Sequence, residues 1–264
     1  MKKVLSVACA LCMTTAMLTG CGSSNNAGTA ATGEAQNSAA ASTTTEQAST
    51  ATDAGTTLIA LITMDSLDQH WVTLNEGAQK AAAELGVTVQ FMAPNTKDDA
   101  QQIECVNNAV SAGAQAIIVA ANGPDAISSA LREASDAGVK LIYVDSPANV
   151  SAEATFSTDN NAAGKTAGEE MKKALADAGV TSGSIGIINV NAATDSCVMR
   201  EEGFRSAFEG TDFELLETQY GEGDAAKSQS IAENYITQGV VGIFGCNEGS
   251  TTGAGNAIKA SGKD

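Results

Sequence analysis

Short, unbroken apolar runs that alternate with helical segments constrain the fold of this chain more than any other feature. Seven such runs lie at residues 58–62, 87–92, 116–121, 141–144, 185–190, 213–216 and 240–244. Continuous apolar runs of this length are typical of parallel strands that are buried on both faces. The alternation therefore predicts an α/β protein with parallel sheets and right-handed crossovers.

The segments between these runs have helical periodicity and end in glycine. Apolar residues recur at helical spacing in three of them, at Leu74, Ala78, Ala81 and Leu85, at Ile103, Val106 and Val110, and at Ile127, Ala130, Leu131 and Ala134. The glycines that lead into the next strand are Gly86, Gly113, Gly138 and Gly239. Because glycine tolerates the left-handed conformation that closes a helix, these positions predict helix C-termini.

The distribution of strands predicts two similar, doubly wound lobes. Residues 58–150 form the N-terminal lobe, and residues 151–264 form an irregular crossover, a helix over 162–178 and the C-terminal lobe. A last predicted helix, over 251–261, ends at Gly262 without a strand after it. We therefore expect the second lobe to be incomplete and the chain to be truncated at its C-terminus.

Residues 1–20 have the organisation of a secretion signal. Lys2 and Lys3 precede an apolar run that is too short to span a bilayer comfortably. The run ends in LTGC at residues 18–21, which resembles the lipobox of bacterial lipoproteins. That resemblance implies that Cys21 is diacylated and becomes the mature N-terminus; the alternative is an ordinary signal peptide followed by a chance cysteine.

Residues 21–57 have the composition of a disordered tether. From residue 22 onward the segment contains no Val, Ile, Leu, Met, aromatic residue, Lys or Arg. Such a segment buries too little apolar surface to offset the entropy lost on ordering. Together with the lipid anchor, it predicts a folded part held at the outer face of the cytoplasmic membrane.

Charge and composition exclude several functional classes. The chain has 14 Lys and Arg against 31 Asp and Glu, a formal net charge of −17, which argues against a nucleic-acid partner. His70 is the single histidine, so a histidine-rich metal site or a Ser-His-Asp hydrolase is not expected. We predict no catalytic set, no metal and no cofactor.

Cysteines and phosphate-binding patterns add no further chemistry. Cys105, Cys197 and Cys246 are isolated and are predicted to be small buried side chains, with a Cys197–Cys246 disulfide left open. Residues 159–166 (DNNAAGKT) and 221–228 (GEGDAAKS) approach a P-loop. Each lacks one glycine that would let backbone amides surround a phosphate, so nucleotide hydrolysis is not expected.

Polar side chains follow the ends of the predicted strands, where open α/β sheets bind ligands. They are Asp68, His70, Trp71, Asn95, Asn122, Asp145, Ser146, Asn191, Gln219 and Asn247. Carboxylates and amides bond hydroxyl groups, and an indole covers the apolar face of a sugar ring, so this set suits a polyhydroxylated ligand. Taken alone, Trp71 is equally well a core residue, and Asp145 a turn or cap residue.

Four segments of the chain resemble the type I periplasmic sugar-binding proteins of the ribose-binding type. They are residues 61–80 (LITMDSLDQHWVTLNEGAQK), 139–146 (VKLIYVDS), 157–168 (STDNNAAGKTAG) and 243–253 (IFGCNEGSTTG). The family's Asn-Pro-Phe-Phe is DQHW here, and its arginine after the ligand aspartate is Ser146. A second ligand arginine of the family aligns with Val198, two residues before Arg200.

The resemblance implies a set of binding and hinge residues. The candidate ligand-binding residues are Asp68, His70, Trp71, Asp145, Ser146, Arg200 and Asn247. Asp159 and Asn160 lie at the family's first interlobe crossover and are the candidate hinge.

The predicted function is that of the substrate-binding lipoprotein of an ABC importer, a monomer that closes two lobes on a sugar or related polyol and delivers it to a membrane permease. The alternative is a ligand sensor that partners a membrane receptor kinase. Repressors with this fold begin with a DNA-binding helix-turn-helix, whereas this chain begins with a signal and a tether.

Overall fold

The structure is a computed structural model that describes residues 56–262. The predicted signal at 1–20, the lipidation site Cys21 and nearly all of the tether lie outside the described residues. The described residues all belong to one compact unit. Within the described part, every helix is too short or too polar to cross a bilayer.

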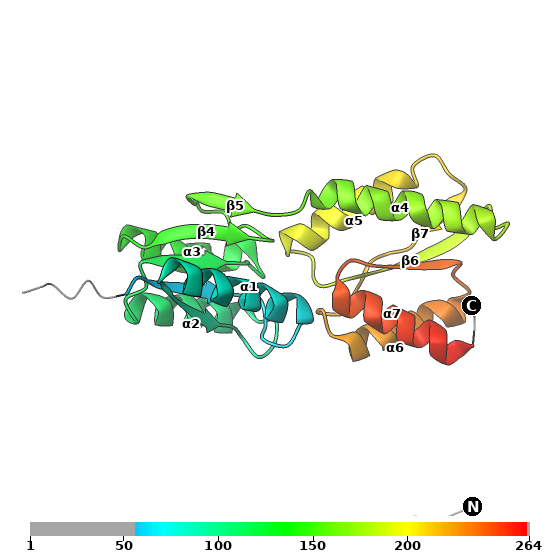
Figure 1. Cartoon of the computed structure of the whole chain (residues 1–264). Coiled ribbons are helices and arrows are strands. Elements are labelled where there is room, and N and C mark those ends of the chain that lie inside the picture. Colours follow the sequence, from blue (N-terminus) through cyan, green and yellow to red (C-terminus); the bar gives the residue numbers. More distant parts are fainter. Residues whose placement is uncertain (1–55, 263–264) are drawn as a thin grey trace, which may run out of the picture. The chain divides into compact units, whose positions relative to one another are not determined.

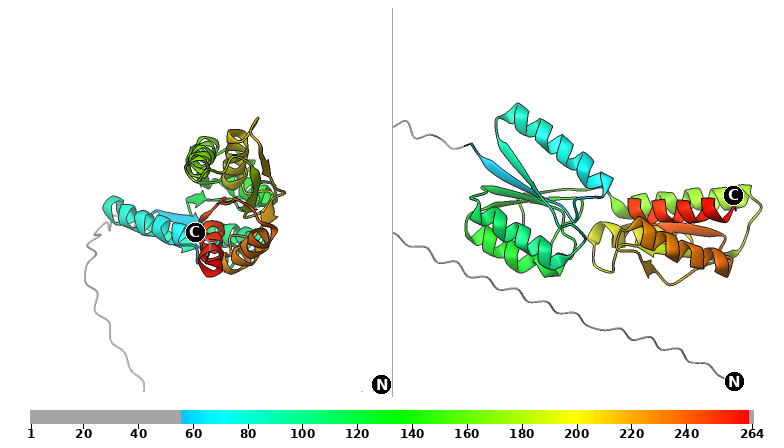
Figure 2. Two further views of the ribbon diagram at one scale, coloured as in Figure 1. Left: turned by 90° about the vertical axis from the view of Figure 1, so that its right-hand side faces the viewer. Right: turned by 90° about the horizontal axis from the view of Figure 1, so that it is seen from below.

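The first sheet has five parallel strands in the order β2-β1-β3-β4-β5. They are β1 (Leu58–Ile62), β2 (Thr88–Met92), β3 (Ala116–Val119), β4 (Lys140–Val144) and β5 (Ala154–Phe156). The helices that connect them are α1 (Gln69–Leu85), α2 (Asp99–Ser111) and α3 (Pro124–Asp136). Helix α1 covers one face of the sheet, and α2 and α3 cover the other (Figures 1 and 2).

The second sheet is built around the buried strand β6 (Gly183–Asn189). Strand β6 pairs in parallel with three other strands, β7 (Phe213–Leu215), β8 (Gln219–Tyr220) and β9 (Gly242–Gly245). The flanking helices are α4 (Asn160–Asp177), α5 (Asp195–Ala207), α6 (Ala225–Gln238) and α7 (Glu248–Ser261). Helices α4 and α5 lie on one face and α6 and α7 on the other (Figure 1).

Glycines allow these paired helices to approach closely. A Cβ at Gly164 of α4 would overlap the carbonyl oxygen of Arg200 in α5, and a Cβ at Gly203 of α5 would overlap the carbonyl oxygen of Asn161. Both positions therefore require glycine. The close approach fixes the height of Arg200 relative to the N-terminus of α4.

All seven predicted strands are present, and the α/β fold with parallel sheets is confirmed. The predicted glycine caps are also present: Gly86 ends α1 and Gly239 ends α6 at φ 67° and 80°. The apolar face of α3, with Ile127, Leu131 and Ala134, is buried as predicted.

Two short strands were not predicted from the sequence. The connection expected to be irregular contains β5, which pairs with β4 although Phe156 is 66% exposed. The apolar run at 213–216 forms β7, and after a short interruption the chain returns to the sheet as β8. In the interruption, Arg205 donates hydrogen bonds to the carbonyl oxygen of Leu216 at 3.1 Å and to the hydroxyl of Thr218 at 2.9 Å. Neither strand carries an apolar run, and most of their residues are exposed: Thr155 and Phe156 in β5, and both residues of β8.

The apolar spacing wrongly placed Ala81 and Leu85 on the buried face of α1. Both residues are exposed, Leu85 to 75%, and the buried residues of the helix are Trp71 and Ala82. No second helix in the described part of the chain packs beside α1 on its face of the sheet, so the last turn of α1 stays in contact with solvent (Figure 2).

Candidate ligand-binding site

The carboxyl ends of strands from both sheets surround a cavity of about 140 Å³. Its lining residues are Met64, Asp68, His70, Trp71, Lys97, Asp145, Val190, Ser196, Cys197, Arg200, Asn247 and Glu248. Six of the seven predicted ligand-binding residues are among them, and Ser146 is the exception. A larger and more open groove of about 840 Å³ adjoins the cavity and shares Asp68, Lys97 and Glu248 with it.

The loop between β1 and α1 is shaped by the buried carboxylate of Asp65. Its Oδ1 accepts hydrogen bonds from the amides of Leu67 and Asp68 at 2.8 and 2.7 Å, and its Oδ2 accepts one from Lys97. Burial acts to raise the pKa of Asp65, but these donors and the positive charge of Lys97 outweigh it and hold the pKa below its usual value. These hydrogen bonds stabilise the loop conformation that places Asp68 at the cavity.

Asp68 begins α1 and also faces the cavity. Its Oδ1 accepts a hydrogen bond from the amide of His70 at 3.1 Å, which caps the helix. Its Oδ2 lies 3.5 Å from Nζ of Lys97. Asp68 thus carries out a structural and a candidate binding role with different oxygens.

Trp71 is both a core residue and a cavity residue. It is 3% exposed and packs in a small apolar cluster with Met64 and Ala120, against Leu74 and Val144. The His70 ring meets the indole edge-on, with centroids 4.6 Å apart. The indole Nε1 is buried without a hydrogen-bond partner, which is uncommon for a tryptophan inside a protein.

Asp145 is held in a left-handed backbone conformation at the end of β4, with φ 62°. Its Oδ2 lies 2.8 Å from the hydroxyl of Ser196 on α5 and 3.0 Å from that of Ser146. The two serine hydroxyls are 2.8 Å apart. Ser146 is fully buried behind the cavity wall, so its side chain links Asp145 to Ser196 instead of facing a ligand.

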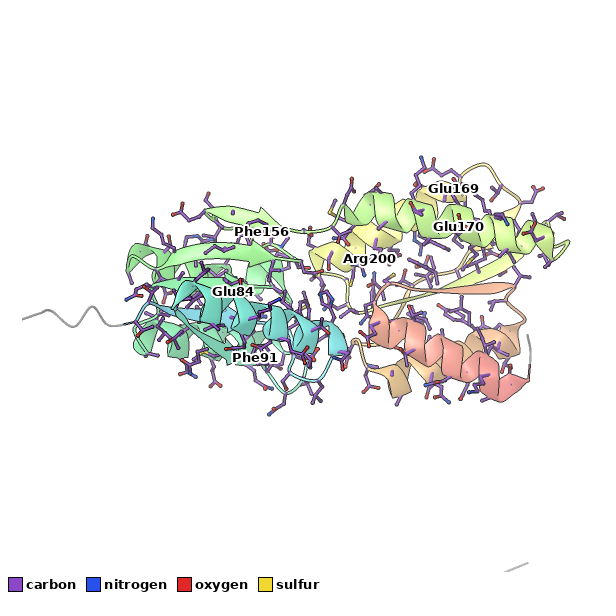
Figure 3. The ribbon with its side chains drawn as sticks, in the orientation of Figure 1. Glu84, Phe91, Phe156, Glu169, Glu170 and Arg200 are labelled. Carbon is purple, nitrogen blue, oxygen red and sulfur yellow. The ribbon has the colours of Figure 1, made fainter. Side chains whose placement is uncertain are left out.

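Arg200 lies on α5 (Figure 3) and lines the cavity. Its Nε and Nη2 donate to Oδ1 of Asn160 at 3.2 and 2.7 Å, and its Nη1 donates to the carbonyl oxygen of Cys246. Asn160 is 2% exposed and opens α4, while the carboxylate of Asp159 caps that helix through the amide of Ala162 at 3.0 Å. Both predicted hinge residues thus lie at the helix start that Arg200 contacts.

Asn247 contributes from the end of β9. Its Oδ1 accepts a hydrogen bond from the amide of Ser250 at 3.0 Å and caps α7, which leaves the amide Nδ2 as its donor for the cavity. Other strand-end residues lie elsewhere. Asn122 and Asn191 contact each other and Thr194, Asn95 lies in the open groove, and Gln219 lies within β8.

The cysteines and acidic residues offer no metal site in the described chain. Cys105, Cys197 and Cys246 are free thiols, and Sγ of Cys197 lies 3.9 Å from the carbonyl oxygen of Cys246. Burial raises the pKa of both Cys197 and Cys246, so these thiols stay protonated. No cluster of three or more His, Cys, Asp or Glu residues between 56 and 262 could hold a metal ion.

Lys97 and Glu248 line the cavity but were not predicted as site residues. Lys97 lies two residues after the strand-end residue Asn95, and Glu248 directly follows Asn247. Proximity to a strand end was the available signal for both. The pairing of Lys97 with Asp65, 32 residues earlier in the chain, has no signature in the sequence.

The two lobes of parallel α/β architecture and the cavity at their strand ends define a two-lobe binding protein. The periplasmic binding protein domain matches residues 59–264, and the chain belongs to this family. It is 28% identical over 218 residues to the ribose import binding protein RbsB of Haemophilus influenzae, covering 81% of this chain and 72% of that protein. It is 26% identical over 221 residues to the D-apiose import binding protein of Actinobacillus succinogenes, covering 82% and 70%.

Solved structures of the same fold agree with these sequence relationships. A sugar transporter from Clostridium phytofermentans superposes with a TM-score of 0.71 at 29% identity, over 78% of this chain and 77% of that one. An ABC transporter solute-binding protein from Agrobacterium vitis, bound to α-D-tagatopyranose, gives 0.73 at 25% identity, over 78% and 72%.

Proposed function

We propose that this protein is the lipid-anchored substrate-binding component of an ABC importer and that it captures one monosaccharide or related polyol for a membrane permease. The observation that carries the proposal is the convergence of carboxylate, amide, guanidinium and indole groups from both sheets on one cavity. Two relatives are named as import binding proteins for ribose and D-apiose, and these names support a sugar as the class of ligand.

The lining chemistry supports a polyhydroxylated ligand. Asp68 and Asp145 are acceptors for hydroxyl protons, whereas Arg200 and Asn247 are donors to hydroxyl or ring oxygens. Trp71 supplies an apolar face and an indole N–H that has no acceptor in the protein. A sugar presents the same mixture of hydroxyl groups and apolar C–H faces.

The size of the cavity supports a single sugar unit. A cavity needs roughly 10–15 Å³ to hold one water molecule, and this cavity measures about 140 Å³. It therefore holds on the order of ten non-hydrogen atoms, the size of a pentose or hexose.

Binding is proposed to close the lobes about the connection at Asp159 and Asn160. A ligand that contacts groups of both lobes stabilises the closed arrangement more than an open one, and this difference in affinity drives closure. The permease would then recognise the closed form.

A thermal-shift screen tests the proposal. The mature protein is mixed with pentoses, hexoses, inositols and nucleosides, each over a range of concentrations. We expect at least one sugar or polyol to raise the melting temperature selectively and saturably, because binding to the native state alone stabilises it by RT ln(1 + [L]/Kd). The absence of any selective shift across the sugars and polyols would contradict the proposed ligand class.

A further inference from the structure

Lys97 is a buried cation at the wall of the candidate site. Its side chain is 7% exposed, its ammonium group pairs with Oδ2 of Asp65, and it lies 3.5 Å from Oδ2 of Asp68. The side chains of Asp65 and Asp68 are 6% and 12% exposed. Since charges at this depth require compensating partners, the three side chains form one mutually dependent group.

The second lobe contributes to the position of this lysine. Gly223, between β8 and α6, lies against the end of the Lys97 side chain: a Cβ at this glycine would be 2.7 Å from Nζ and 2.8 Å from Cε. Gly223 also has φ 73°, which favours glycine. Lys97 is therefore confined between the two loops and cannot easily turn away from Asp68.

Lys97 reduces the excess of negative charge at the cavity. Three carboxylates and two cations line it: Asp68, Asp145, Glu248, Lys97 and Arg200. Removing Lys97 would leave three carboxylates against Arg200 alone, with Asp65 unpaired behind them. Arg200 in turn already donates three of its five N–H groups, to Asn160 and Cys246, which leaves two for a ligand.

We propose that Lys97 sets the charge class of the ligand: by offsetting the charge of Asp68 it favours uncharged polyols over positively charged amino sugars, while the carboxylates that line the cavity disfavour sugar acids and sugar phosphates. This inference rests on the proposed function. A carboxylate or phosphate on the ligand would face Asp68, Asp145 and Glu248 at short range, and like charges brought together in a binding site oppose association. Without Lys97, the same carboxylates would favour a positively charged amino sugar.

The experiment uses three probes that share one carbon skeleton. They are the neutral sugar that stabilises the wild-type protein most, its 2-amino-2-deoxy derivative, and the derivative in which the terminal CH₂OH is oxidised to a carboxylate. Calorimetric titrations at about pH 6 keep the amine protonated and the carboxylate ionised. We expect the wild type to bind the neutral sugar at least about tenfold more tightly than the carboxylate, a difference of about 1.4 kcal/mol.

Variants of the ion pair then separate a charge role from a packing role. In Lys97→Met, which keeps the length of the side chain, the affinity for the amine relative to the neutral sugar should rise about tenfold. Lys97→Arg, which keeps the positive charge, should keep the wild-type ratio of amine to neutral-sugar affinity. Asp68→Asn, which removes a negative charge, should lower that ratio. If Lys97→Met shows no cooperative melting, the result for Asp68→Asn tests the proposed charge effect in its place.

Each outcome has a distinct meaning. Equal or tighter binding of the carboxylate by the wild type would overturn this inference, as would an unchanged amine-to-neutral ratio in folded Lys97→Met. Either result would leave the proposed function intact. If no sugar stabilised the wild type at all, the proposed function would fail and the inference with it.

Discussion

The guanidinium group of Arg200 donates two hydrogen bonds to the side-chain oxygen Oδ1 of Asn160, from Nε at 3.2 Å and from Nη2 at 2.7 Å. Arg200 lines the cavity, whereas Asn160 opens α4 directly after the connection from the first sheet. The guanidinium group of Arg200, which a ligand would contact, is thus hydrogen-bonded to Asn160, where the lobes are proposed to rotate. This contact would link ligand binding to the proposed hinge.

Replacement of Asn160 should therefore weaken ligand binding although Asn160 does not line the cavity. Asn160→Ala removes the acceptor of two guanidinium hydrogen bonds, and bonds to charged groups contribute roughly 1.5–3 kcal/mol each. We expect a loss of affinity of about tenfold or more in calorimetry, with Asn160→Asp, which keeps an acceptor, close to the wild type. Wild-type affinity in Asn160→Ala would show that the contact serves folding alone.

Asp145 should contribute to affinity through its carboxylate and to stability through its backbone. Asp145→Asn keeps a residue type that tolerates φ 62° but removes the charge, so affinity should fall by about 1–2 kcal/mol with a small change in melting temperature. Asp145→Ala should lose both, because alanine adopts this conformation poorly. If titration shows that Asp145→Asn binds as tightly as the wild type, Asp145 does not contact the ligand.

The fold was predictable because strands that are buried on both faces have continuous apolar sequences. Strands buried on both faces, such as β1 and β6, stand out in the sequence, whereas the partly exposed β5 and β8 do not. Leu85 has the right spacing for the buried face of α1 and is nevertheless exposed, because spacing does not say how much of a helix is covered.

The candidate site was predictable in part, because loops that follow parallel strands gather at one edge of a sheet. Asp68, Asp145 and Asn247 meet at one cavity for that reason. Ser146 also follows a strand, but its hydroxyl turns toward Ser196, a pairing over 50 residues that only the fold creates. The pairing of Lys97 with Asp65 could not be predicted for the same reason, since the two residues are 32 positions apart in the chain.

Trp71 should affect affinity and stability separately. Trp71→Phe keeps most of the apolar packing but removes the indole N–H, so affinity should fall while the protein stays folded. Trp71→Ala should cost about 1–3 kcal/mol of binding free energy, the scale for losing one aromatic stacking surface, and about 3–5 kcal/mol of stability. Unchanged affinity in folded Trp71→Phe, measured by calorimetry, would indicate a purely structural role for the indole N–H.

The close packing of α4 on α5 should make Gly164 intolerant of a methyl group. Gly164→Ala drives a Cβ into the carbonyl of Arg200, and overpacking of this kind costs about 1–3 kcal/mol. Gly255→Ala in α7 is the matched control, because a Cβ there meets no atom within 4 Å. It should stabilise the helix by about 0.5–1 kcal/mol. Chemical denaturation that gives both variants the same free energy of unfolding would contradict the packing described for Gly164.

Membrane attachment should depend on Cys21. Cys21→Ser removes the thiol that would carry the acyl chains, so the protein should move from the membrane fraction to the soluble fraction of the cell envelope. Immunoblotting of the two fractions measures the shift, and Cys105→Ser is the matched control. A Cys21→Ser protein that still sediments with membranes would rule out the lipobox interpretation.

Trp71 is the single tryptophan of the chain, and it lines the cavity, so its fluorescence reports directly on whether a ligand binds there. The decisive measurement is a titration of the wild-type protein with the sugar that stabilises it most, followed by tryptophan emission and by calorimetry. We predict a saturable change in emission with the same midpoint as the heat signal and a stoichiometry of one sugar per chain. A sugar that binds by calorimetry but leaves the emission of Trp71 unchanged would contradict the assignment of this cavity as the binding site.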